Sequence, residues 1–580
     1  MHKRVCTGLS LLCAAVAAFL LPGLLRLPHT ATHHWLYALG AAGVFAACRA
    51  LLAKTRSRLR TYALGLGFAF ALCQLAGARL DAADTLGGAR AALALLTCAL
   101  ALAPAMGAGF AWLARRAEEI RPSEGERLRG GWVFWGCFAA ILAAWLPMYL
   151  AYYPGMFNYD STGEITQVLA HSYDGNFPIA HTLLLGAFYR LGEALGSYHT
   201  GIALYTALQC AALAASMAYA ALYLYRLGCS RWLWLGMTAL FALLPTHSLL
   251  AMCTTKDLFF SAALLVLMLR LHMLWRAPGA ARVRDYVIIA GLTALLCLMR
   301  NNGVLAILAA ALGALPALAT YKRSRRRALA ALLCGVVLFG AVTAGLSAIT
   351  HPRRGGIREW LSVPLMQVAR VWARADEAGK PLPEDAEIRA FIPQVERYQR
   401  HLADGVKRKT TVGVVNMPQF LSLWGRLFAQ HPADFVDAAA YLTKGYWHLN
   451  DETHLDIYAE RGNHGYLETM NQDGLGVTRQ SVLPGLMERM DALFVENEYR
   501  RVPLLATLVE PAFWCWMVCA LVVWMAYRRD RGGLWAASLL MGLFASMLFG
   551  PCAYIRYAYP LALCAPALLG LGWARPRGEN

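Results

Sequence analysis

Charged residues are scarce in this chain of 580 residues: Lys, Arg, Asp and Glu together make up only 15%, whereas hydrophobic residues make up 58%. Soluble domains carry about 25% charged residues, so a single soluble core is excluded. Long apolar runs recur along the sequence, and about 20 apolar residues suffice for a helix to cross a bilayer. The composition therefore predicts a multi-pass membrane protein in contact with a lipid bilayer.

Acidic residues are fewer than basic ones, 35 against 54, which gives a net charge of +19. Such an excess can indicate a nucleic-acid-binding protein, so the position of the basic residues decides. Many of them lie in short clusters between apolar runs, at 54–60, 115–129, 322–327 and 528–531. Short clusters of Lys and Arg between apolar runs are typical of the cytoplasmic loops of membrane proteins, so we expect no nucleic-acid partner.

Cysteine is missing from the polar stretch at 350–503, although the chain has fifteen. A disulfide framework or a cysteine metal site in that stretch is therefore excluded, and the remaining cysteines are interpreted as small buried apolar residues. Short internal repeats are also missing, which argues against a solenoid.

The apolar runs predict an all-α polytopic protein with about fourteen transmembrane helices, the first of them retained rather than cleaved. The runs are 5–26, 34–53, 61–79, 89–114, 131–152, 199–225, 232–249, 257–275, 286–299, 303–320, 328–349, 504–526, 533–550 and 554–573. Threading them from a cytoplasmic start puts every basic cluster on the cytoplasmic side. Both termini are then cytoplasmic, and the pattern is that of a bacterial cytoplasmic (inner) membrane protein.

Four units follow from this threading. Residues 1–130 form a four-helix transmembrane addition, and residues 131–350 form a transmembrane core whose first outer loop spans 153–198. Residues 351–503 are polar and carry amphipathic helical patterns, so they predict a mainly helical extracytoplasmic domain. Residues 504–580 add three transmembrane helices.

The first outer loop contains a candidate general base, Asp160, a few residues beyond the fifth span. If a helix starts at Ser161, then Asp160, Glu164 and Gln167 share one face through i, i+4 and i+7 spacing. A carboxylate there can take a proton from an acceptor hydroxyl. The alternative is that Asp160 only caps that helix. His181 follows later in the same loop as a further polar candidate.

A lysine opens the eighth span, Lys256, followed directly by Asp257. A lysine on the outer side opposes the charge bias, and at a helix start it opposes the helix dipole, so it requires an anionic neighbour. That neighbour is either Asp257 itself or a phosphate group, which the free N–H groups of a helix start also favour.

Two further cations are expected at the same face. Arg300 and Asn301 lie in a polar break between two apolar runs, and Arg556 and Tyr557 open the last span. Arg300 alone is compatible with a side chain that merely reaches the surface. Three cations at one membrane face are more than such scattering predicts, so they are interpreted as a substrate site.

The segment from His448 to Asp456 combines imidazole and carboxylate groups, so a divalent cation is conceivable there. Its spacing matches no dedicated metal motif, and a solvated polar loop is the preferred interpretation.

Together, Asp160, the Lys256-Asp257 pair and the Arg556-Tyr557-x-x-Pro560 element resemble the GT-C superfamily of membrane glycosyltransferases. A larger set is similar to an uncharacterised family of bacterial membrane proteins: Tyr153-Pro154-Gly155, Asp160, Gln167, Pro178, His181-Thr182, Lys256-Asp257 and Arg300-Asn301-Asn302-Gly303. The resemblance covers about residues 131–575. It departs from the usual GT-C pattern because Asp160 has no acidic neighbour and the large outer domain precedes the last three spans.

The resemblance implies a GT-C-like core that moves a sugar from a polyprenyl-phosphate donor to a glycan, lipid or protein acceptor of the cell envelope. It implies that Asp160 is the catalytic residue and that Lys256, Arg300 and Arg556 hold the donor phosphate. Neighbouring polar side chains would complete the substrate site: Tyr557, His181, Gln167, Glu164, Asp257 and Asn301. A transporter or flippase of an anionic lipid-linked substrate, or a glycan ligase or polymerase, are the alternatives.

Overall fold

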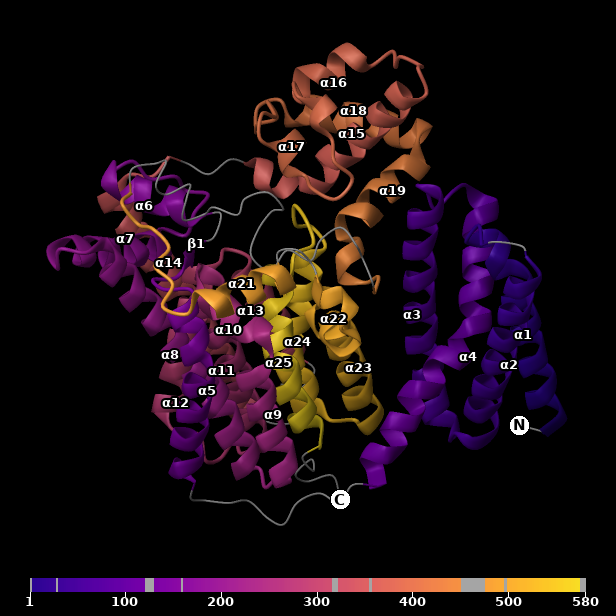
Figure 1. Ribbon diagram of the computed structural model, residues 1–580, viewed down its shortest axis with the longest axis horizontal. Coiled ribbons are helices and arrows are strands. Elements are labelled where there is room, and N and C mark those ends of the chain that lie inside the picture. Colours follow the sequence, from indigo (N-terminus) through magenta and orange to yellow (C-terminus); the bar gives the residue numbers. More distant parts are fainter. Residues whose placement is uncertain are drawn as a thin grey trace.

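The computed structural model describes residues 3–27, 30–119, 130–157, 160–315, 322–353, 357–449, 475–494 and 498–573. In these ranges the regular elements are helices, apart from one parallel pair of two-residue strands. Figure 1 shows a slab of long, roughly parallel helices with a smaller helical domain above it. The predicted all-α class is confirmed.

The first four helices form a unit at one side of the slab: α1 (Lys3–Leu24), α2 (Ala31–Lys54), α3 (Ser57–Ala83) and α4 (Ala89–Glu119). α3 and α4 approach closely because small residues face each other. A Cβ on Gly67 would lie 2.2 Å from the Ala103 carbonyl oxygen, and one on Gly107 would lie 2.3 Å from that of Ala63. Such small-residue contacts are typical of helix packing in membranes.

The larger unit packs around two central helices, α11 (Lys256–Arg276) and α25 (Ile555–Trp573), which are the most buried of the long apolar helices described. The helices around them are α5 (Gly131–Ala151), α8 (Tyr198–Arg226), α9 (Arg231–Leu243), α10 (Pro245–Met252), α12 (Val283–Met299), α13 (Gly303–Ala314), α14 (Lys322–Thr350), α23 (Pro511–Arg528) and α24 (Arg531–Met547). Residues far apart in sequence thus share one apolar core.

Ten helices in the described residues are long and apolar enough to cross a membrane, which indicates a multi-pass membrane protein. An eleventh span results if α9 and α10, bent by 50° at Leu244, cross together. The other three predicted spans correspond to α12, α13 and α24, which have 17, 12 and 17 residues. These are shorter than the about 20 residues of an ordinary span.

The basic clusters gather at one end of the slab. An Arg115 guanidinium nitrogen donates to the Lys54 carbonyl over 3.3 Å, and Arg58 donates to the Ala526 carbonyl over 3.5 Å. Arg528 donates to the carbonyl of Gly572 near the end of α25. The start of α1 and the end of α25 also lie away from the small domain (Figure 1).

The small domain has a hydrophobic core of its own, built from residues between Leu361 and Leu442. Its helices are α15 (Ser362–Glu377), α16 (Asp385–Phe391), α17 (Asp404–Lys407), α18 (Met417–Gln430) and α19 (Pro432–Thr443), with short 3-10 turns η2 (Ile357–Leu361), η3 (Val395–Arg397) and η4 (Lys444–Tyr446). Residues 351–503, which were predicted as one domain, are therefore divided: only the part up to about Leu442 shares this core.

After residue 475 the chain returns to the larger helical unit around α11 and α25, which is called the membrane unit below. The amides of Gln480 and Val482 donate to the carbonyls of Tyr153 and Leu150 over 3.0 and 2.9 Å. Three short helical elements follow on the same unit: α21 (Pro484–Phe494), η5 (Glu498–Arg501) and α22 (Pro503–Val509). These backbone hydrogen bonds fix the position of this last part of residues 351–503 against the membrane unit. No sequence pattern indicates such bonds.

Candidate functional site

Two loops are joined by the only strand pair among the described residues. β1 (Met156–Phe157) pairs in parallel with β2 (Cys253–Thr254). The Ser161 hydroxyl donates to the Thr254 carbonyl over 2.6 Å and extends the joint. Because parallel strands run in the same direction, the residues that follow each strand emerge side by side. Asp160 and Lys256 are the charged residues that follow.

Gly155 allows the β1–β2 strand pair to form beside α8. Its φ of +145° disfavours other residues, and a Cβ there would lie 2.5 Å from the Thr206 hydroxyl of α8. The loop can therefore lie directly against α8 only with glycine at this position.

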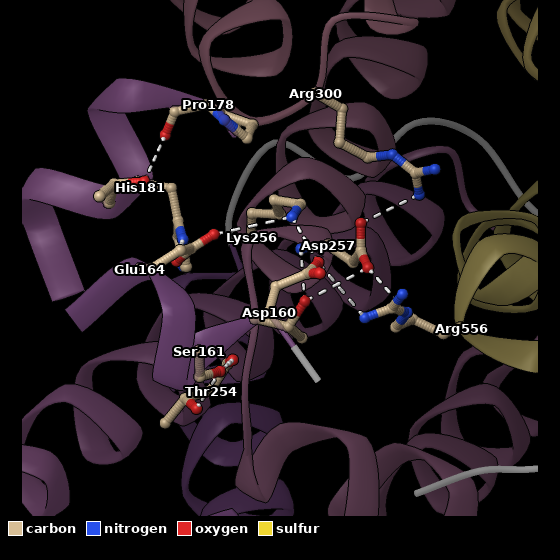
Figure 2. A network of polar contacts seen from close by, with 12 residues as sticks. Asp160, Ser161, Glu164, Pro178, His181, Thr254, Lys256, Asp257, Arg300 and Arg556 are labelled. Carbon is tan, nitrogen blue, oxygen red and sulfur yellow. Dashed lines mark hydrogen bonds and ion pairs between the residues drawn. The ribbon is translucent and has the colours of Figure 1, made fainter. Parts of the chain in front are cut away.

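Asp160 faces a cation instead of capping a helix. The predicted helix is α6 (Ser161–Leu169), yet the Asp160 side chain makes no capping hydrogen bond to it. The Lys256 ammonium donates to Asp160 Oδ2 over 2.7 Å and lies 3.6 Å from Glu164 Oε1 (Figure 2). The capping alternative is therefore wrong, and the partner of Lys256 is not its neighbour Asp257.

Asp257 instead pairs with the other two cations. Its Oδ1 lies 3.0 Å from Arg300 Nη1, and its Oδ2 lies 3.5 Å from Arg556 Nε. Arg556 Nη1 also lies 3.7 Å from Asp160 Oδ2, so one guanidinium bridges both aspartates. The predicted convergence of the three cations is confirmed (Figure 2).

Aromatic rings support the two arginines. The Arg300 guanidinium lies over Phe260 and Tyr557, 5.4 and 5.1 Å from the ring centres, and that of Arg556 lies 5.0 Å from Tyr557. The Arg300 side chain is only 13% exposed, so it does not simply reach for solvent. Cation–π contacts fix the direction in which both guanidinium groups point.

A cavity of about 700 Å³ opens beside these groups. The membrane unit contributes Asp160, Lys256, Asp257, Arg300, Arg556 and Tyr557, and the small domain contributes Arg358, Glu359, Arg397, Asp404, Lys407 and Arg408. With Asp174, seven basic and five acidic side chains line it, an excess of two positive charges. The cavity therefore favours an anionic ligand.

The ionisation of Asp160 follows from its neighbours. Burial disfavours its charged form, but the Lys256 ammonium and the Arg556 guanidinium outweigh this effect and hold the pKa of the carboxyl well below its usual range. Asp160 is therefore an anion at neutral pH.

His181 lies behind the cavity, at the start of α7 (Ile179–Ala194). Its Nδ1 lies 2.6 Å from Glu164 Oε2 and its Nε2 lies 2.7 Å from the Tyr205 hydroxyl. Glu164 and His181 are both 1% exposed, so they reach the cavity only through Lys256.

Two predicted site residues lie elsewhere. The Gln167 side chain accepts from the Asp174 amide over 2.7 Å, because two helical turns carry it away from Lys256 and towards the next loop. Asn301 is exposed and lines a separate cavity beside α14, whereas its neighbour Asn302 lines the main one. Successive residues of this turn point in different directions.

The site also contains residues that the sequence did not single out. Tyr446 and Lys407 line the cavity, and Lys407 pairs with Glu359 over 2.8 Å. The Lys407-Arg408-Lys409 run is the only sequence signal for the small-domain wall. In the part of the chain that the structure describes, no group of three or more His, Cys, Asp or Glu residues could hold a metal ion. Of the conceivable cation segment, residues 450–456 lie outside the described residues.

Comparison with known proteins gives one match. A protein-family model described as a family of unknown function (DUF6020) matches residues 171–579. The matched part includes Lys256, Arg300 and Arg556, whereas Asp160 lies just before it. No curated protein and no solved structure matches the chain.

Proposed function

The chain belongs to DUF6020, a family of unknown function, and we propose that it is a membrane glycosyltransferase with a GT-C-like core. It moves a sugar from a polyprenyl-phosphate donor to an extracytoplasmic acceptor of the cell envelope. The observation that carries this proposal is the convergence of Lys256, Arg300 and Arg556 with Asp160 on one cavity.

The proposal includes a topology. All fourteen apolar stretches cross the inner membrane of a bacterium, with both termini in the cytoplasm and the small domain outside. The basic clusters support this orientation, because they gather at the end of the slab away from the small domain. The cavity then lies at the outer face, where a lipid-linked donor presents its phosphate.

The site supplies the groups that a sugar transfer needs. An acceptor hydroxyl attacks the anomeric carbon and forms the new C–O bond, while the bond from that carbon to the phosphate oxygen breaks. The electron pair leaves with the polyprenyl phosphate, whose charge Lys256, Arg300 and Arg556 stabilise. The hydroxyl proton passes to Asp160.

Donor binding also makes Asp160 a better base. Without a ligand, Lys256 and Arg556 stabilise its charged form and depress its basicity. A bound phosphate competes for both cations and adds a negative charge beside the carboxylate, and each effect raises the pKa of Asp160. The base is therefore activated only when the donor is present.

The experiment uses the full chain in proteoliposomes with undecaprenyl-phosphate-linked sugars and an envelope extract as acceptor. Transfer releases free undecaprenyl phosphate, which mass spectrometry detects, whereas a flippase leaves the lipid-linked sugar intact. We expect release with the wild-type chain and none with Lys256→Gln. Arg60→Gln, at the opposite end of the molecule, is the matched control for loss of a cation. Intact donor translocated to the other leaflet by the wild-type chain would contradict the proposal.

A further inference from the structure

A chain of hydrogen bonds runs from the back of the cavity into the membrane unit. It links Glu164, His181, Tyr205 and Gln209, all of which are 1% exposed or less. Glu164 Oε1 faces the Lys256 ammonium at 3.6 Å (Figure 2), so the charge of Glu164 acts directly on the candidate site. The number of protons in this chain therefore matters for ligand binding.

The direction of the hydrogen bonds is fixed at Gln209. Its Nε2 lies 3.0 Å from the Ala251 carbonyl oxygen and 2.6 Å from that of Cys253. Carbonyl oxygens only accept, so the amide nitrogen must point towards them. The Oε1 atom is therefore an acceptor, and it receives the Thr255 amide over 3.3 Å.

This direction passes on to His181. The Tyr205 hydroxyl has one proton and donates it to Gln209 Oε1 over 3.3 Å. With this proton on the Gln209 side, the Tyr205 oxygen accepts from His181 Nε2, 2.7 Å away, and Nε2 carries a proton.

The remaining contact joins His181 Nδ1 and Glu164 Oε2 at 2.6 Å. A neutral imidazole with its proton on Nε2 has none on Nδ1, and two acceptors do not approach so closely. In this direction of the chain, one proton lies between them. Either an imidazolium faces a carboxylate or a neutral imidazole faces a carboxylic acid, and in both cases the net charge of the pair is zero.

We propose that the hydrogen bonds run in this direction and that His181 is a positioning residue. It cancels the charge of Glu164, and so leaves the inner group of charges around Lys256 net positive for a phosphate-bearing lipid. Lys256, Arg300 and Arg556 then face only two uncompensated carboxylates, Asp160 and Asp257. Without the shared proton, Glu164 is a third carboxylate beside Lys256, and this inner group of charges is neutral. The inference rests on the proposed function for the identity of the anion.

The test compares His181→Gln with the double variant His181→Gln/Glu164→Gln. The single variant leaves Glu164 ionised beside Lys256, and the double variant makes the pair neutral again. The full chain in nanodiscs is titrated with undecaprenyl phosphate. Placing one extra negative charge near the bound phosphate should weaken binding by about 10-fold to 100-fold at a protein-like dielectric. We expect the double variant to regain most of this loss.

His272→Gln is the matched control. His272 is 2% exposed and its Nδ1 lies 2.8 Å from the Tyr223 hydroxyl, so it is another buried histidine bonded to a tyrosine. It lies in α11 far from Glu164 in sequence and pairs with no carboxylate among the described residues. A loss of affinity in this control as large as that of His181→Gln would mean that any buried histidine matters, and would overturn the inference.

Unchanged affinity in His181→Gln, or no recovery in the double variant, would also overturn it. A second measurement separates this outcome from failure of the proposed function. In thermal unfolding without lipid, His181→Gln should be destabilised and the added Glu164→Gln should restore stability, because a buried uncompensated carboxylate is costly. If the variants show this rescue of stability but the wild-type protein binds no undecaprenyl phosphate, only the proposed function is contradicted.

Discussion

At the scale of single residues, Arg556 has the most contacts to explain: it touches both aspartates of the cavity and lies over Tyr557. A guanidinium can direct several N–H groups in one plane, whereas a lysine ammonium is a single point charge. Arg556 therefore sets the distance between Asp160 and Asp257 as well as the charge of the site.

Substitution of Arg556 should separate these two roles. Arg556→Gln removes a charged hydrogen-bond donor, worth about 1.5–3 kcal/mol, so undecaprenyl phosphate binding should weaken by at least about 10-fold. Arg556→Lys should recover part of the binding but little transfer, because the charge remains and the bridge is lost. Equilibrium binding and product release are the measurements. A lysine variant with full transfer activity would show that only the charge matters.

Asp160→Asn tests the proposed base, since it keeps the size of the side chain and removes the charge. Loss of a general base lowers the rate by about 100-fold to 10,000-fold. The variant should still fold, because Asp160 makes no capping bond to α6. It should be less stable than the wild type, because Lys256 loses its closest ion-pair partner. Transfer in proteoliposomes is the readout. Wild-type turnover would exclude Asp160 as the base.

The pH dependence of stability follows from the same carboxyl. The pKa of Asp160 is lower in the folded protein than in the unfolded chain, where Asp has a value of about 3.9. The stabilisation from its ionised form is therefore complete above that value and is lost as pH falls through the lower folded value. Between about pH 5 and 8, the stability difference between wild type and Asp160→Asn should be constant. A difference that grows steadily across that window would contradict the assigned direction.

At the scale of elements, the loop between α3 and α4 attaches the small domain to the N-terminal helices. Asp84 lies 3.2 Å from Arg370 Nη2 and 2.8 Å from Arg400 Nη1, and it accepts from the Tyr441 hydroxyl over 2.7 Å. The Arg370 side chain is fully buried, so its positive charge has to be compensated by a nearby carboxylate, and Asp84 provides it. Because the small domain forms one wall of the cavity, this loop also positions the site.

Asp84→Ala should loosen that attachment. Removing the partner of a buried charge costs about 3–5 kcal/mol, so amide hydrogen exchange in α15 and α19 should become clearly faster. Glu387→Ala is the control, since Glu387 pairs with Arg426 on the surface and such pairs contribute about 0–1 kcal/mol. Equal exchange in the two variants would show that the small domain is held elsewhere.

At the scale of the whole molecule, the proposed topology predicts which face each loop reaches. Lys380 follows α15 of the small domain, and Ala280 follows the end of α11 that lies away from Lys256 and the cavity; both residues are exposed. In a background without the exposed Cys334, a membrane-impermeant maleimide should label Lys380→Cys in spheroplasts. It should label Ala280→Cys only after the membrane is permeabilised. The reverse pattern would invert the topology.

The start of α6 at Ser161 and of α11 at Lys256 could be predicted, because helix starts and apolar runs are local patterns. The convergence of Lys256, Arg300 and Arg556 was predicted because three cations at one membrane face are more than scattered surface side chains would give. The carboxylate that pairs with each of these cations was not predicted. Lys256 binds Asp160, which is 96 residues away, and no local spacing could indicate this.

The sequence by itself determined the class of this protein, its apolar helices and the charged residues at one face, because each depends on composition or on periodicity within a single helix. Only the tertiary structure decided which carboxylate meets which cation, that the small domain closes one side of the cavity, and that His181 lies within hydrogen-bond distance of Glu164. Those features depend on contacts between segments far apart in the chain. Such contacts form when packing places two side chains together, so no single stretch of sequence encodes them.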